Sequence, residues 1–119
     1  VFNNLRTSSN VQRAKIQLQQ SEIAVKEQTN QLRQAIESAF NDTQSSQKSF
    51  LASKKQVEAL EETLRIIESQ YNLGAANFTE YQIASNNLFA AKSDLARSKF
   101  NYIFKQKILD FYQNRPLTF

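Results

Sequence analysis

The sequence predicts an all-α protein, and three features support that prediction. The 119-residue chain contains one Gly and one Pro. These residue types mark most tight turns, so the chain has little room for the many turns that a sheet protein needs. Apolar residues recur at seven-residue intervals over most of the length, which is typical of helices packed in a coiled coil. The mean hydropathy of −0.57 is too low for a deep globular core, but the patterning is too regular for disorder.

The first predicted helix spans about residues 3–70. One heptad series contains Val11, Leu18, Val25, Leu32 and Ala39, and a second contains Phe50, Val57, Leu64 and Tyr71. Between Ala39 and Phe50 the step is eleven residues, which is a four-residue stutter that locally unwinds a left-handed supercoil. Neither Gly nor Pro interrupts this span, so we expect one continuous helix of about 100 Å at 1.5 Å per residue.

The second predicted helix spans about residues 79–112. Its large seam residues are Tyr81, Leu88, Leu95, Tyr102 and Leu109, and the small residues Ala84, Ala91 and Ser98 follow three positions after the first three. Alternating large and small side chains on a seam lets two helices approach closely. Pro116 marks the exit from this helix, because proline cannot continue one.

A short turn separates the two predicted helices. Gly74 can adopt a left-handed backbone at the end of the first helix, and either Asn77 or Thr79 can cap the second one. Helices joined by so few residues are normally antiparallel neighbours. We therefore predict a single domain over residues 1–119, a long antiparallel coiled-coil hairpin with unequal arms.

The unequal arms leave part of the longer helix without a partner. The row formed by Val11, Leu18, Val25 and Leu32 lies beyond the reach of the shorter helix. Leaving such side chains exposed forgoes about 1.5–3 kcal/mol of burial for each. We expect the chain, which begins at Val1 rather than Met, to be a fragment of a larger protein that self-associates when isolated.

Composition argues against several classes of function. The chain has no His and no Cys, so we expect no metal site and no cofactor. Glu58, Glu61, Glu62 and Glu68 lie on one helix without an accompanying base or nucleophile, and we expect a solvated face rather than an enzyme. The net charge is +4, but the basic residues are mixed with acidic ones, so we expect no nucleic-acid binding. A nucleic-acid-binding coiled coil would need a basic stripe and would lose affinity steeply with salt.

From Tyr71 onward the sequence has an aromatic residue, two further residues, a Gly, a polar stretch, an acidic residue, small residues at heptad spacing and closing aromatics. These are Tyr71, Gly74, Asn77, Glu80, Ala84, Ala91 and the segment "FNYIF" at 100–104. In order and spacing they resemble the TolC family of outer membrane efflux proteins. The opening "VFNNLRTSSNVQRAKIQ" resembles the family's strand-to-helix junction, which implies that Val1 and Phe2 end a strand.

This resemblance implies a function as well as a fold. Family members are homotrimers whose shared β-barrel lies in the outer membrane of Gram-negative bacteria and whose helices continue as a periplasmic tunnel. The chain would be one hairpin of that tunnel, with the lipid-embedded barrel strands absent from it. Such channels passively conduct substrates for drug efflux or type I secretion, together with a periplasmic adaptor and an inner-membrane transporter.

The resemblance also implies roles for the residues of the turn. The adaptor-contact turn would comprise Leu73, Gly74, Ala75, Ala76 and Asn77. Tyr71 and Glu80 match positions at the tunnel gate, where three copies of a carboxylate would form a ring that attracts cations. Ala76 replaces a basic residue, and Ile83 stands where a second acidic residue can occur.

Each role has a purely structural alternative. Gly74 can simply end the first helix, and Tyr71 can be an ordinary seam residue. The negative charge of Glu80 can stabilise the N-terminus of the second helix through the helix dipole. For the whole chain, the rival interpretation is a coiled-coil adaptor or scaffold hairpin for protein–protein assembly. That rival predicts arms of similar length flanked by β-rich sequence.

Overall fold

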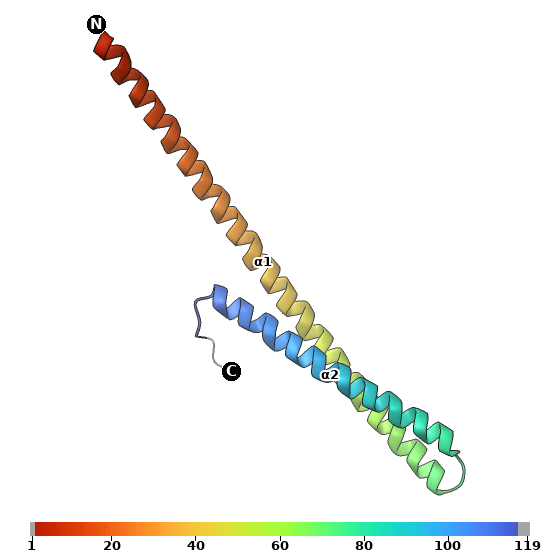
Figure 1. The fold of residues 1–119 in the computed structure, drawn as a ribbon. Coiled ribbons are helices and arrows are strands. Elements are labelled where there is room, and N and C mark those ends of the chain that lie inside the picture. Colours follow the sequence, from red (N-terminus) through yellow and green to blue (C-terminus); the bar gives the residue numbers. More distant parts are fainter. Residues whose placement is uncertain (1, 117–119) are drawn as a thin grey trace. The chain divides into compact units, whose positions relative to one another are not determined.

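The computed structural model describes residues 2–116, with side chains from residue 7 onward. These residues form two α-helices and no strand: α1 at Phe2–Asn72 and α2 at Phe78–Tyr112 (Figure 1). The all-α prediction is confirmed, and the predicted ends of both helices lie within two residues of those observed. The expectation that Phe2 ends a strand is wrong, because Phe2 begins α1 and no described segment offers it a strand to pair with. Val1 lies outside the described residues.

The chain divides into two compact units, Val1–Ser38 and Ala39–Phe119. In the first unit, the four members of the N-terminal row (Val11, Leu18, Val25 and Leu32) are 50–66% exposed. Ile16 and Ile23 are equally exposed, at 55% and 66%, on another face of the same helix. The predicted row of unpartnered aliphatic side chains is therefore present.

The second unit is the helical hairpin. Within it, α2 runs antiparallel along the C-terminal part of α1 (Figure 1). The core consists of Val57 from α1 with Leu88 and Ala91 from α2, flanked by the half-buried leucines Leu60, Leu64 and Leu95. Ala84 and Ala91 are only 6% and 4% exposed, so the small residues of α2 are the ones in closest contact with α1. The heptad seam is where the sequence predicts it.

Polar contacts join the helices at the end of the hairpin remote from the turn. The Thr43 hydroxyl is hydrogen-bonded to the carbonyl oxygen of Lys105 at 3.1 Å and to that of Ala39 at 2.8 Å. Lys105 Nζ lies 2.7 Å from Asp42 Oδ2. Phe50 stacks on Tyr102 one step closer to the turn, with ring centroids 6.1 Å apart. The polar segment at the stutter is thus helical and bonded to α2.

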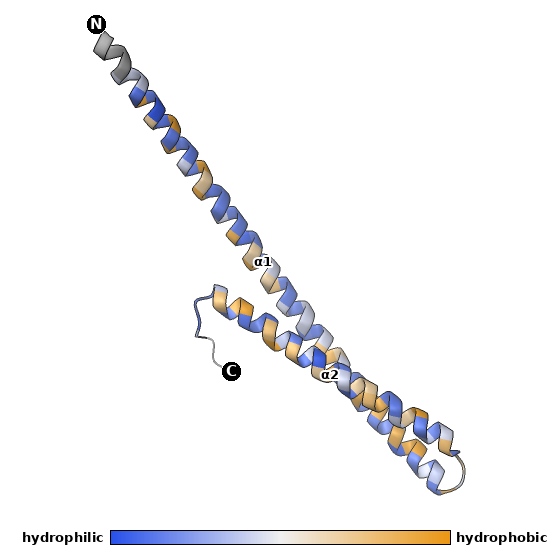
Figure 2. Cartoon of the chain, in the orientation of Figure 1, coloured by the Kyte–Doolittle hydropathy of each residue, from blue (hydrophilic) through white to orange (hydrophobic). Residues whose placement is uncertain are grey.

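Polar and apolar residues alternate along both helices (Figure 2). Over the residues that the structure describes, neither helix contains a stretch long and apolar enough to cross a membrane.

Candidate functional site

The candidate site is the tip of the hairpin, which begins where α1 ends. Gly74 has a φ of +75°, so it adopts the predicted left-handed conformation. Its N–H donates to the carbonyl of Tyr71 at 3.0 Å, and the next N–H, from Ala75, donates to the carbonyl of Gln70 at 2.8 Å. This pair of bonds is the Schellman motif, which satisfies carbonyl groups at a helix end. A Cβ on Gly74 would meet nothing within 4 Å, so glycine is favoured here by its φ and not by lack of space.

Asn77 begins the returning helix as its N-cap. The Glu80 N–H donates to Asn77 Oδ1 at 2.9 Å, and the Asn77 N–H donates to Glu80 Oε2 at 3.0 Å. This reciprocal arrangement is a capping box, which satisfies two N–H groups that have no partner inside the helix. Of the two caps that the sequence allows, the structure uses Asn77, and Thr79 lies inside α2.

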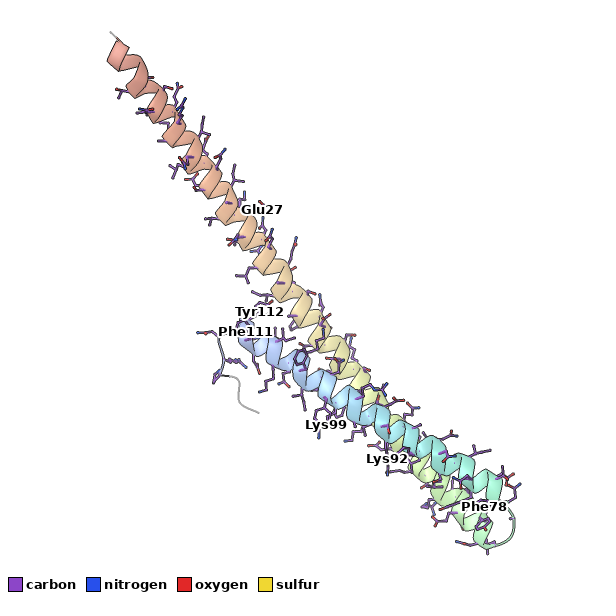
Figure 3. All side chains as sticks on the ribbon, in the orientation of Figure 1. Glu27, Phe78, Lys92, Lys99, Phe111 and Tyr112 are labelled. Atoms are coloured by element: carbon purple, nitrogen blue, oxygen red, sulfur yellow. The ribbon has the colours of Figure 1, made fainter. Side chains whose placement is uncertain are left out.

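Three aromatic rings gather beneath the turn. Tyr71 stacks on Tyr81 with ring centroids 5.7 Å apart, and Phe78 tilts against Tyr71 at 6.3 Å. Tyr71 remains 41% exposed and Phe78 60% exposed, so the cluster is open to solvent on one side. Phe78 is labelled at the tip in Figure 3. Each aromatic pair at such distances stabilises a fold by about 0.5–1.5 kcal/mol, in addition to the contribution from the apolar area that it buries.

The structure brings all the predicted site residues to this tip. Four of the five turn residues are exposed, among them Leu73 at 81%, while Ala76 is half-buried. Glu80 is exposed as well, and the capping box occupies one of its two carboxylate oxygens. The sequence analysis did not identify Phe78 as part of the site. Its position directly after the cap, seven residues beyond Tyr71, is the signal that marks it.

Two of the carboxylates on α1, those of Glu61 and Glu62, enter ion pairs. Glu62 receives two hydrogen bonds from Arg65, at 2.8 and 2.7 Å, and these bonds hold the pKa of the Glu62 carboxyl below its usual value of 4.5. Glu61 Oε1 lies 2.8 Å from Lys92 Nζ, across the hairpin. Among the described residues, no group of three His, Cys, Asp or Glu side chains is placed to hold a metal ion.

The glycine turn and the capped return helix define an antiparallel coiled-coil hairpin. The model of the outer membrane efflux protein family matches residues 1–109, and the chain belongs to that family. It is 30% identical over 73 residues to the outer membrane protein TolC of Escherichia coli (strain K12), a match that covers 61% of this chain and 15% of that protein. No solved structure gives a significant match. The family model and the match to TolC confirm the resemblance to the TolC family.

Proposed function

We propose that this hairpin is a wall segment of the periplasmic tunnel of a trimeric outer membrane channel. The channel passively conducts substrates for efflux or type I secretion, and an inner-membrane transporter supplies the energy. Barrel strands outside this chain contact the outer membrane lipid. The family membership and the helical hairpin support this proposal, since the matched relative is itself an outer membrane protein.

The tip of the hairpin docks the periplasmic adaptor. The observation that carries this proposal is the combination of a fixed backbone with an exposed apolar side chain at the turn. The Schellman motif and the capping box hold the backbone from Gln70 to Glu80. They leave Leu73 81% exposed, and an exposed apolar side chain on an ordered backbone suits a docking contact.

An exchange at Leu73 tests the adaptor contact without disturbing the hairpin. In the complete channel, Leu73→Asp is expected to reduce co-purification of the adaptor at least tenfold and to abolish efflux. Its side chain carries no packing role, so channel abundance should stay constant. The matched control is Ile23→Asp, which changes a 66% exposed residue away from the tip. Unchanged adaptor recovery for Leu73→Asp, or equal losses for both variants, would contradict the docking role.

The tip also forms the gate of the tunnel. Glu80 keeps Oε1 free of hydrogen bonds to the described residues while Oε2 caps the helix, so the carboxylate is available to cations. Three such carboxylates around the trimer axis would attract cations to the tunnel mouth. Tyr71 lies against the same turn and sets its position through the aromatic cluster.

The alternative function, an adaptor or scaffold hairpin, has less support. It predicts arms of similar length, whereas α1 has 71 residues and α2 has 35. The family match also favours the channel.

A further inference from the structure

The seam between α1 and α2 changes its chemistry halfway along the hairpin. The half nearer the tip contains the core residues Val57, Leu88 and Ala91, which are 4–9% exposed, and Glu61 pairs with Lys92 across it at 2.8 Å. We call this part the apolar half. In the other part, which we call the polar half, hydroxyl-bearing side chains take most of the seam positions. Its buried and half-buried seam residues are Ala39, Thr43, Ser46, Phe50 and Ser53 on α1 and Ser98, Tyr102, Lys105 and Leu109 on α2.

Two hydroxyls of the polar half make their hydrogen bonds inside their own helix. Ser46 is 6% exposed, and its Oγ donates to the carbonyl of Thr43 at 2.9 Å. Ser98 is half-buried, and its Oγ donates to the carbonyl of Leu95 at 3.0 Å. Separation of the two helices keeps both bonds and exposes hydroxyls that water can also bind. These positions therefore oppose separation much less than the aliphatic side chains of the apolar half do.

Thr43 carries a hydroxyl that bonds across the hairpin, but it has a second acceptor. Its Oγ1 lies 3.1 Å from the carbonyl oxygen of Lys105 on α2 and 2.8 Å from that of Ala39 on its own helix. A hydroxyl has one proton to donate, so Thr43 can donate to Ala39 alone once α2 has moved away. The ion pair of Lys105 with Asp42 is partly exposed, with side chains 33% and 49% accessible, and such pairs are weak in water.

Packing in the polar half is incomplete at the end remote from the tip. A groove of about 140 Å³ opens there between the helices. It is lined by Leu109 of α2 and by four residues of α1, which are Phe40, Thr43, Gln44 and Gln47. A side chain that lines a groove has fewer packing contacts to lose when the helices separate.

We propose that the polar half is a compliant segment of the hairpin, in which α2 from Ser98 to Tyr112 moves away from α1 and returns while the apolar half stays closed. The stack of Phe50 on Tyr102, with ring centroids 6.1 Å apart, stabilises the closed form, because stacked rings attract beyond the area that they bury. The hinge lies at Ser98, whose hydroxyl bonds back to a carbonyl of its own helix, a kind of bond that often accompanies helix bends.

The use of this motion rests on the proposed function. A tunnel wall that yields away from the tip can widen around a bulky substrate while the tip keeps its docking contact. The turn and the apolar half would then stay rigid, and the polar half would supply the movement.

Thiol labelling of single-cysteine variants tests the opening. The 119-residue chain has no native Cys. Ser46→Cys in the polar half and Ala91→Cys in the apolar half place a thiol at seam positions of similar burial, 6% and 4% exposed. A maleimide is expected to label Ser46→Cys at least tenfold faster, because this position is reached without opening the core. Equal rates, which global unfolding would give, would overturn the proposal.

The role of the aromatic stack is tested in the background of each cysteine variant. Tyr102→Ala is expected to speed labelling of Ser46→Cys at least fivefold and to leave Ala91→Cys unchanged. Tyr102→Phe keeps a stacked ring, so Ser46→Cys should then label at its original rate. Equal acceleration at both thiols would show that the whole hairpin opens, and acceleration at neither would show that the stack does not stabilise the closed form. Either result would contradict the proposal.

A disulfide across the polar half tests the use of the motion in the complete channel. The pair Ser46 and Lys105 is matched by Leu60 and Ala91, fourteen residues nearer the tip on each helix. A disulfide needs Cα atoms within about 7 Å, and the Thr43 bond brings the Lys105 backbone close to α1. Oxidised Ser46→Cys with Lys105→Cys is expected to lower efflux of a bulky dye at least fivefold, with recovery on reduction. Leu60→Cys with Ala91→Cys should not lower it.

The outcomes separate this inference from the proposed function. No effect of the polar-half disulfide, or equal effects of both disulfides, would overturn the role of the motion in conduction. A complete wild-type channel that does not conduct would refute the proposed function, whereas labelling of the 119-residue chain would still decide whether the polar half opens.

Discussion

Asn77 and Glu80 cap α2 reciprocally, each side chain accepting a hydrogen bond from the other's backbone N–H, at 2.9 and 3.0 Å. The same Glu80 carboxylate is the group proposed to attract cations at the tunnel gate. Its capping role needs an oxygen acceptor, whereas its gating role needs a negative charge. The two roles are therefore separable by mutation.

Glu80→Gln keeps an oxygen acceptor for the Asn77 N–H and removes the charge. In the complete channel, we expect it to weaken block by polyvalent cations at least tenfold at unchanged thermal stability, because the carboxylate ring is lost. Single-channel recordings with a trivalent cation measure the block.

Asn77→Ala is the matched control, since it removes the cap and keeps the charge at Glu80. It should cost about 1 kcal/mol of stability, read from thermal unfolding of the isolated chain, and leave the cation block intact. Identical block in the wild type and in Glu80→Gln would remove Glu80 from the gate.

Gly74 is expected to matter through its backbone conformation alone. Gly74→Val should destabilise the turn by about 1–2 kcal/mol, because a β-branched residue is strained at positive φ. Helicity by circular dichroism should remain mostly intact, while adaptor binding by the complete channel should fall.

Gly74→Asn provides the control for this interpretation. Asparagine tolerates the left-handed region, and a Cβ at this position has open space, so adaptor binding should be largely retained. Efflux in cells that is the same for Gly74→Val as for the wild type would argue against a role of the turn in docking.

Thr43 and Lys105 hold the hairpin together at its other end. Thr43→Val removes the hydroxyl at nearly constant shape and leaves the part-buried carbonyl of Lys105 without this donor, at a cost of about 1 kcal/mol. Lys105→Met should lower the free energy of unfolding by less than Thr43→Val does. Its ion pair with Asp42 is partly exposed, and such pairs contribute between zero and about 1 kcal/mol. Urea unfolding followed by circular dichroism measures both. A larger loss for Lys105→Met than for Thr43→Val would reverse this ranking.

The sequence was sufficient to predict the two helices, because heptads on either side of a single Gly leave few alternatives. It was also sufficient for the seam, since Val57, Leu88 and Ala91 occupy the predicted positions and form the core. The choice between Asn77 and Thr79 as cap stayed open, because both side chains can accept from a backbone N–H. The contact of Phe78 with Tyr71 and that of Thr43 with Lys105 depend on the exact register of the hairpin, which heptad spacing alone does not fix.

The N-terminal row is predicted to drive association of the isolated chain through a surface separate from the hairpin. Leu18 and Val25 are 61% and 66% exposed, and burying such side chains against a partner is worth about 1.5–3 kcal/mol each. Leu18→Ser with Val25→Ser should therefore reduce the association constant at least tenfold, measured by sedimentation equilibrium. Ile16→Ser with Ile23→Ser removes two aliphatic side chains of similar exposure on another face of the same helix, so it should have a much smaller effect. A monomeric wild-type chain, or equal effects of the two double variants, would show that this row does not mediate association.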